Sequence, residues 1–210
     1  MRWLPVAVVI VSGCLDRAGA NDSIKSDAVS DAAEVGASDT PAPAPDSTGL
    51  DPVFSELPDE WVEAPLGFCD ELAHQSIATY NNDGDTIGIA TGDRVRFIGV
   101  DATETNTADC YAEEGKNALR ALLAPNKTIC LYPDPAGPDK DTFDRLLRYV
   151  FIKVDGVWRM LNIRLVRLGA AKAYHDFLKG KQFRVQTEQA EILARDEARG
   201  GWGRCGWVIE

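Results

Sequence analysis

Short apolar segments, each bounded by turn-forming residues, dominate the chain between Ser76 and Phe177. They are rich in β-branched and aromatic side chains and cover residues 76–91, 93–101, 128–134, 145–160 and 171–177. This length and composition predict about five β-strands. Thr91-Gly92-Asp93 supplies a tight reversal between the first two, and Asp155-Gly156 supplies another inside the fourth.

Three amphipathic segments accompany the strands, at residues 111–124, 160–168 and 182–199. Their apolar residues recur at helical spacing, and they end next to Pro125, Gly169 and Gly200, residue types that terminate helices. The order of elements predicts a mainly β fold with α-helices (α+β), in which three helices pack on a small barrel.

The first 14 residues read MRWLPVAVVIVSGC and predict a signal peptide, because their apolar run is too short to span a bilayer. Val11-Ser12-Gly13-Cys14 resembles the bacterial lipobox, in which the cysteine is lipidated. The alternative is an ordinary signal peptide with an incidental cysteine. We therefore expect an exported protein anchored through Cys14 at the outer membrane or cell surface, or otherwise a periplasmic or secreted one.

Residues 15–65 are rich in Asp, Ala, Ser and Pro and have no sustained apolar period. Such a stretch cannot bury enough surface to offset chain entropy, so it predicts a disordered tether before a domain at residues 66–210. Residues 1–64 carry 12 acidic and three basic side chains, whereas the rest carries 21 and 19. The domain is therefore close to neutral.

Four cysteines lie in the domain, and export to an oxidising compartment makes them disulfide candidates. Four cysteines allow three pairings. We favour Cys110 with Cys130, which closes a helix onto the next strand, and Cys69 with Cys205, which joins the domain ends. A zinc site is disfavoured because the chain has two histidines and no closely spaced cysteine pair.

Carboxylates cluster at both ends of the first predicted hairpin, in the stretch DGDTIGIATGDRVRFIGVDATET. Asp83 and Asp85 precede one strand, and Asp101 and Glu104 follow the next. Gathered carboxylates repel each other, and a hard cation such as Ca²⁺ relieves that cost. Each acid also has a simpler interpretation as a turn residue.

Two arginines complete the set. Arg96 interrupts an apolar strand, and Arg145 precedes another. Either arginine alone has a simpler interpretation as a solvated surface charge. Together with a carboxylate site they indicate phosphodiester chemistry, since arginine forks bind phosphate oxygens while a carboxylate activates water.

These motifs resemble the thermonuclease (staphylococcal nuclease) family over residues 76–207. The residues that carry the resemblance are DGDT at 83–86, Arg96 leading to VDATET at 100–105, DTFDRLLRYV at 141–150, LVRLGAA at 165–171 and Trp202. Their order and spacing follow the family pattern. The resemblance implies a five-stranded OB-type barrel with three helices.

The resemblance also implies a calcium site. Asp85, Asp101 and the carbonyl of Ala102 would bind Ca²⁺, with Asp83 and Thr86 in support. The implied activity is that of a phosphodiesterase or endonuclease that acts on single-stranded or loosened DNA and RNA and leaves 3′-phosphates. We also expect the protein to be a monomer.

Within that implied mechanism Glu104 is the general base, and Arg96 and Arg145 hold the phosphate. Side chains expected to contact bases or phosphate are Phe143, Tyr174, His175 and Phe177. For His175, a solvated position at a strand end is the alternative.

Four positions depart from the family pattern: Ala102 and Thr103 replace threonine and proline, Phe143 replaces tyrosine, and Asp144 replaces glycine. Asp144 places a negative charge beside Arg145 and loses the conformational freedom of glycine. The alternative function is therefore a catalytically inactive OB-fold module that binds nucleic acid or protein at the cell envelope. A structural envelope lipoprotein would explain the tether but not the paired arginines.

Overall fold

The computed structural model describes residues 61–81, 83–107 and 109–209. The predicted signal peptide, Cys14 and the tether up to residue 60 lie outside the described residues, so their predictions stay predictions. No described helix is long and apolar enough to cross a membrane.

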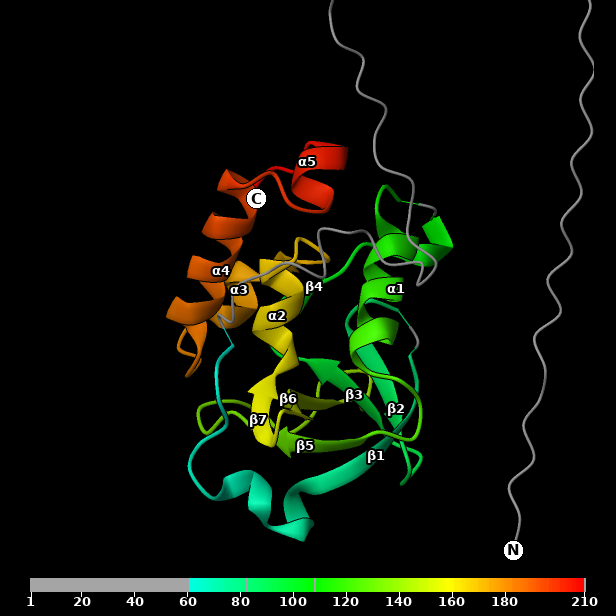
Figure 1. The fold of residues 1–210 in the computed structure, drawn as a ribbon, viewed down its shortest axis with the longest axis vertical. Coiled ribbons are helices and arrows are strands. Elements are labelled where there is room, and N and C mark those ends of the chain that lie inside the picture. The colour runs from blue at the N-terminus through cyan, green and yellow to red at the C-terminus, as the bar shows by residue number, and fades with distance from the viewer. Residues whose placement is uncertain (1–60, 82, 108, 210) are drawn as a thin grey trace, which may run out of the picture. The chain divides into compact units, whose positions relative to one another are not determined.

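Five short strands close into a barrel (Figure 1). The strands are β1 (Gln75–Asn81), β2 (Thr86–Ile89), β3 (Arg94–Phe97), β5 (Thr128–Tyr132) and β6 (Leu146–Val154). Neighbours around the ring run β1-β2-β3-β6-β5 and back to β1, and all pairs are antiparallel except β3 with β6. The predicted five-stranded barrel is confirmed. A further strand, β7 (Val157–Met160), pairs with β6 across Asp155-Gly156, where both residues have positive φ.

Three main helices pack at one end of the barrel, as Figure 1 shows. They are α1 (Ala112–Leu122), α2 (Leu161–Arg167) and α4 (Arg184–Asp196), each within a predicted segment. Shorter turns are η2 (Phe68–Asp70), η3 (Leu72–His74) and η4 (Thr105–Thr107). Buried side chains fill the barrel and the space under the helices; the largest include Tyr149, Phe97, Phe151, Ile87, Leu119 and Met160.

The predicted strand at residues 171–177 is wrong for most of its length. Only β8 (Lys172–Ala173) pairs, with β4 (Val100–Asp101), and the chain then turns into the short helix α3 (His175–Leu178). The turn buries Leu178 completely, against the backbone of Gly99. Burial of that leucine outweighs the β-propensity of the segment. A second short helix, α5 (Gly201–Cys205), was also not predicted.

Ordered packing begins before the Leu66 boundary that composition predicts. Glu63 forms a β-bridge with Arg159, and the backbone of Val62 and Ala64 hydrogen-bonds to β7. The stretch from Trp61 onward therefore belongs to the domain.

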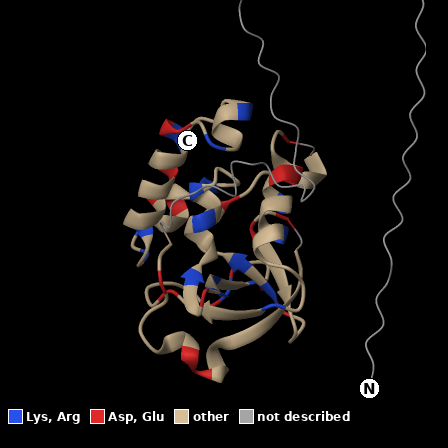
Figure 2. Ribbon diagram, in the orientation of Figure 1, with Lys and Arg blue, Asp and Glu red and all other residues tan. Residues whose placement is uncertain are grey.

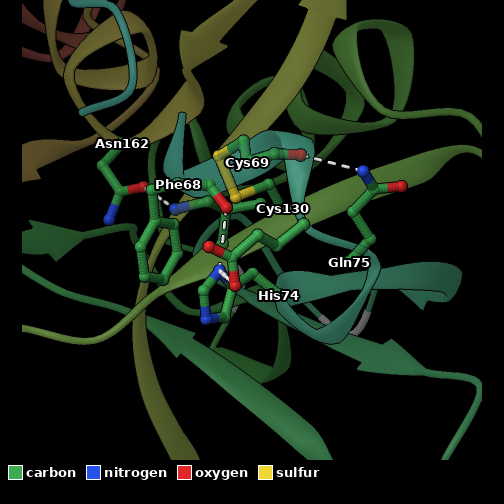
Figure 3. The surroundings of a disulfide bond; sticks show 8 residues. Phe68, Cys69, His74, Gln75, Cys130 and Asn162 are labelled. Atoms are coloured by element: carbon green, nitrogen blue, oxygen red, sulfur yellow. Dashed lines mark hydrogen bonds and ion pairs between the residues drawn. A yellow bond between two sulfur atoms is a disulfide. The ribbon is translucent and has the colours of Figure 1, made fainter. Parts of the chain in front are cut away.

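All four domain cysteines form disulfides, but the favoured pairing is wrong. Cys69 pairs with Cys130, and Cys110 pairs with Cys205. In Figure 3, Cys69 on η2 meets Cys130 on β5. The register explains this contact, because Cys130 lies opposite Gln75 at the start of β1, and the Gln75 side-chain Nε2 donates to the Cys69 carbonyl at 2.8 Å. Which cysteines pair depends on which strands are neighbours in the fold. The separation of the cysteines along the sequence does not reveal those neighbours.

One buried amide fastens the place where the barrel closes. Asn162 on α2 is fully buried; its Oδ1 accepts the Val150 amide at 2.8 Å, and its Nδ2 donates to the Ile98 carbonyl at 3.0 Å. Nδ2 also lies 3.2 Å from the Arg148 carbonyl. The side chain thus joins α2 to the seam between β3 and β6.

We expect Asn162→Ala to lower the free energy of unfolding by about 2–4 kcal/mol, because it leaves buried backbone groups without partners. Chemical denaturation measures the change. Asn117→Ala is the matched control, since Asn117 is an exposed asparagine on α1 with the same gain in helix propensity, and it should stay within roughly 0.5 kcal/mol of the wild type. Equal stability of the two variants would contradict the role assigned to Asn162.

Candidate active site

The β2–β3 hairpin brings an acid next to an arginine. Thr86 on β2 pairs with Arg96 on β3, so Asp85, one residue before β2, lies beside that guanidinium. Arg96 Nη1 is 3.0 Å from Asp85 Oδ2, and Arg96 Nη2 is 3.5 Å from Asp101 Oδ1. Arg96 also donates to the Val100 carbonyl. One cation therefore joins the acids from both ends of the hairpin.

Further hydrogen bonds fix the Asp85 carboxylate. Its Oδ1 accepts the Thr86 hydroxyl at 2.9 Å, and its Oδ2 accepts the Ala102 amide at 2.9 Å. The Asp83 carboxylate accepts the Asp85 amide at 3.1 Å. The structure thus brings together all five residues assigned to the predicted calcium site, Asp83, Asp85, Thr86, Asp101 and Ala102.

Burial makes the Asp85 charge costly. Desolvation raises the pKa of Asp85 to about 7, even though Arg96 acts to lower it and Asp83 raises it further. Asp101, by contrast, has a side chain that is 48% exposed. The pair therefore combines one deeply held carboxylate with one that faces solvent.

Carboxylate and carbonyl oxygens are the ligands that Ca²⁺ prefers. Among the described residues, no three His, Cys, Asp or Glu side chains are grouped closely enough to hold a metal ion by themselves. Asp85, Asp101 and the Ala102 carbonyl therefore fit Ca²⁺ only if water completes the ligand set.

Arg145 is held by a residue that the sequence did not mark as functional. Arg145 Nε donates to Asp141 Oδ2 at 2.7 Å, and Asp141 Oδ1 accepts the backbone amides of Phe143 and Arg145. Burial alone would raise the pKa of Asp141, but these donors keep it below its ordinary value. The spacing of Asp141 four residues before Arg145 was visible in the sequence, but only the loop conformation shows what it does.

Both arginines line one pocket of about 190 Å³. We call it the arginine pocket; its walls are Arg96, Phe97, Asp141, Thr142, Phe143, Arg145, Leu147, Tyr174 and Phe177. The Tyr174 and Phe177 rings stack with centroids 5.9 Å apart, and the Arg145 guanidinium lies 5.3 Å from the Phe143 ring centroid. Three of the four predicted substrate-contacting side chains therefore surround the two arginines.

His175 lies elsewhere. It begins α3 rather than ending a strand, and it lines a separate pocket of about 130 Å³ together with Asp101 and Glu191. His175 Nε2 is 2.6 Å from the buried Glu191 carboxylate, whose other oxygen accepts the Ala173 amide at 2.8 Å. The solvated strand-end interpretation is thus wrong, since His175 has a specific partner.

Glu104 follows β4 and points into solvent. Its backbone carbonyl lies 3.0 Å from the Thr107 hydroxyl. Among the described residues, none forms a hydrogen bond or ion pair with the Glu104 carboxylate.

Asp144 occupies the backbone conformation for which the family pattern supplies glycine. Its φ is 61°, a left-handed value that aspartate tolerates better than most residues. Its side chain is 83% exposed and accepts from Lys140 Nζ at 2.9 Å. The Asp144 charge is therefore paired with Lys140, while Arg145 is held by Asp141.

A family model described as Staphylococcal nuclease homologue matches residues 94–204, which is more than half of the chain. The chain belongs to this family. A search of curated proteins finds no match. Membership of the staphylococcal nuclease homologues agrees with the closed five-stranded barrel and indicates a nuclease-type domain. The matched region contains Arg96, Asp101, Glu104 and Arg145 but begins after Asp85, whose place beside Arg96 comes from the hairpin geometry.

We expect Asp144→Gly to leave the free energy of unfolding within roughly 0.5 kcal/mol of the wild type, because glycine adopts positive φ freely and an exposed ion pair contributes little. Asp144→Ala should lose about 1 kcal/mol, because alanine is strained at that φ. Thermal unfolding of the three proteins measures the difference. An alanine variant as stable as the glycine variant would show that backbone strain is absent.

Proposed function

We propose that this protein is an exported, Ca²⁺-dependent nuclease that hydrolyses phosphodiester bonds of DNA and RNA. The observation that carries the proposal is the position of Arg96, which contacts the Asp85 and Asp101 carboxylates and also lines the arginine pocket with Arg145. A cation site and a phosphate site would therefore share one wall.

The cation would be held by Asp85, Asp101 and the Ala102 carbonyl, with Asp83 and Thr86 orienting Asp85 through the hydrogen bonds described above. When bound, Ca²⁺ would supply positive charge that neutralises the phosphate and stabilises charge building up on its oxygens. The pKa of Asp85, raised first by burial, would fall if a cation bound beside it.

Arg96 and Arg145 would bind the non-bridging phosphate oxygens and stabilise the five-coordinate transition state. Arg96 is 13% exposed and Arg145 is 22% exposed, so phosphate bound between them would be partly shielded from water. Binding would require Arg96 to exchange carboxylate contacts for phosphate contacts. Asp141 would keep the Arg145 fork in place during that exchange.

Glu104 would orient the attacking water and accept its proton as general base. Tyr174, Phe177 and Phe143 would contact the base or sugar next to the scissile phosphate, since aromatic faces accept any base by stacking. This sequence tolerance suits a nuclease for single-stranded or loosened nucleic acid.

The surface charge supports local rather than extended binding of the polyanion. Figure 2 shows Lys and Arg interspersed with Asp and Glu over the ribbon. A near-neutral domain would bind nucleic acid mainly through its arginine pocket, and such binding would weaken as salt increases.

Two disulfides support export to an oxidising compartment. We propose that lipidation of Cys14 anchors the monomer at the outer membrane or cell surface, with the acidic stretch before Trp61 as its tether. The enzyme would then meet nucleic acid outside the cytoplasm.

Digestion of heat-denatured DNA by the full chain tests the activity. We expect cleavage with Ca²⁺, none with EGTA, and a loss in rate on the order of 10²-fold in Glu104→Gln, as for the loss of a positioned base. Glu114→Gln, which changes an exposed glutamate on α1, should cleave like the wild type. A cleavage rate that is unchanged both by EGTA and by Glu104→Gln would refute the mechanism. No cleavage by the wild type would favour the inactive binding module.

Calcium binding is tested separately by thermal stability. With a dissociation constant of roughly 1 mM, typical of extracellular sites, about 10 mM Ca²⁺ should stabilise the folded protein by about 1.4 kcal/mol. Asp101→Asn should lose most of this stabilisation because it removes one charged ligand, while Asp176→Asn, at an exposed acid on α3, should keep it. A calcium-induced shift that is equal in both variants would place the ion elsewhere.

A further inference from the structure

The two disulfides lie in different surroundings. Cys69 and Cys130 are 1% and 0% exposed and join η2 to β5 within the core. Cys110 is exposed and Cys205 is half-buried. Their bond links Cys110, two residues before α1, to Cys205, the last residue of α5. The second disulfide therefore adds nothing to the barrel interior.

Cys205 lies on an element that is anchored to the helical layer. The Gly201 amide donates to the Gly169 carbonyl at 2.9 Å, just beyond α2. The two backbones approach so closely that a Cβ on Gly200 would lie 2.3 Å from that same carbonyl oxygen. The start of α5 is thus fixed by direct backbone contact, and Trp202 behind it is buried.

Aromatic contacts strengthen the same junction. The Trp207 ring meets Trp202 edge-on at 5.6 Å and Tyr111 edge-on at 6.0 Å. Tyr111 is buried and directly follows Cys110, and the Arg204 guanidinium lies 6.0 Å from its ring centroid. Disulfide and rings together hold the chain at Cys110 against the C-terminal segment.

The loop that carries Glu104, residues 102–107, has few other attachments. At its start the Ala102 amide donates to Asp85 at 2.9 Å. At its end the Thr107 hydroxyl lies 3.0 Å from the Glu104 carbonyl and 2.7 Å from the Asp109 carboxylate, and it donates to one of them at a time. Apart from the internal turn η4, no other hydrogen bond of the described residues joins Thr103–Thr107 to the rest of the chain.

We propose that the Cys110–Cys205 disulfide positions Glu104. It fixes the chain at Cys110, six residues after Glu104, to α5, and this short connection limits the positions available to residues 102–107. Without the bond, the carboxylate would spend less time where it can meet the attacking water, and geometric errors of this kind lower the rate of the chemical step. Cys110 and Cys205 are positioning residues, and the inference rests on the proposed role of Glu104 as base.

The other disulfide provides a matched control. The bonded cysteines are separated by 61 residues in one case and 95 in the other, and closure entropy depends only on the logarithm of that length. Both double serine variants should therefore lose stability. Well below both melting temperatures, we expect Cys110→Ser/Cys205→Ser to lose kcat by about 10-fold with KM within roughly twofold of the wild type. Cys69→Ser/Cys130→Ser should keep its kcat.

Backbone NMR order parameters of residues 103–107 are the second readout, because they report loop motion without requiring hydrogen-bonded amides. They should fall in Cys110→Ser/Cys205→Ser and stay unchanged in the control variant. This readout does not need activity, so an inactive wild type would refute the proposed nuclease while leaving the loop tether to be judged by the order parameters. An unchanged kcat in an active enzyme, or unchanged order parameters, would overturn the positioning role.

If the Cys110→Ser/Cys205→Ser variant fails to fold, selective reduction of the wild type replaces it. A dithiol such as dithiothreitol attacks the exposed disulfide, leaves two cysteine thiols and is itself oxidised to a cyclic disulfide. The buried Cys69–Cys130 bond should resist mild treatment. The kcat should fall on reduction and recover on reoxidation, and a kcat that is indifferent to reduction would overturn the proposal.

Discussion

The parallel pairing of β3 with β6 closes the barrel, and the candidate site depends on that seam. In this register Arg96 lies opposite Leu147, so Arg145, just before β6, reaches the same pocket as Arg96. Asn162 on α2 stabilises the seam through hydrogen bonds to Val150 on β6 and to Ile98, which directly follows β3. A buried polar side chain whose hydrogen bonds are all satisfied can specify one arrangement of the elements it joins. Any other arrangement of those elements would leave buried backbone groups unpaired.

Each arginine of the pocket is held by its own carboxylate, in a different environment. Arg96 contacts the deeply buried Asp85, whereas Arg145 contacts Asp141 within a loop. A buried ion pair is rigid, but removing its charges from water costs free energy. A more exposed pair has a smaller desolvation cost, and its side chains are less constrained. The site therefore presents two guanidinium groups that are already oriented, one of them beside a buried carboxylate. Burial raises the pKa of the Asp85 carboxyl, and added positive charge nearby would lower it.

Local sequence predicted those parts that depend on near neighbours. The hairpin from Asp83 to Asp101, the three main helices and the turn at Asp155-Gly156 follow from short-range patterns, and the structure has them. Asp144 illustrates the limit of such inference. Its replacement of glycine suggested interference with Arg145, but the loop turns its charge toward Lys140. Which way a side chain points depends on backbone geometry that residue type alone does not specify.

The sequence by itself determined the family, the barrel and the set of acids and arginines, because alternating apolar residues, turn residues and motif spacing act locally along the chain. Only the tertiary structure decided the cysteine pairing, the helix at His175–Leu178, the partner of His175 and the support of Arg145 by Asp141. The cysteine pairing and the partner of His175 depend on which distant segments become neighbours, whereas the Asp141–Arg145 contact depends on the loop conformation. Strand register brings Cys130 beside Cys69, and burial of Leu178 favours the helix at His175–Leu178; both arise only once the core is packed.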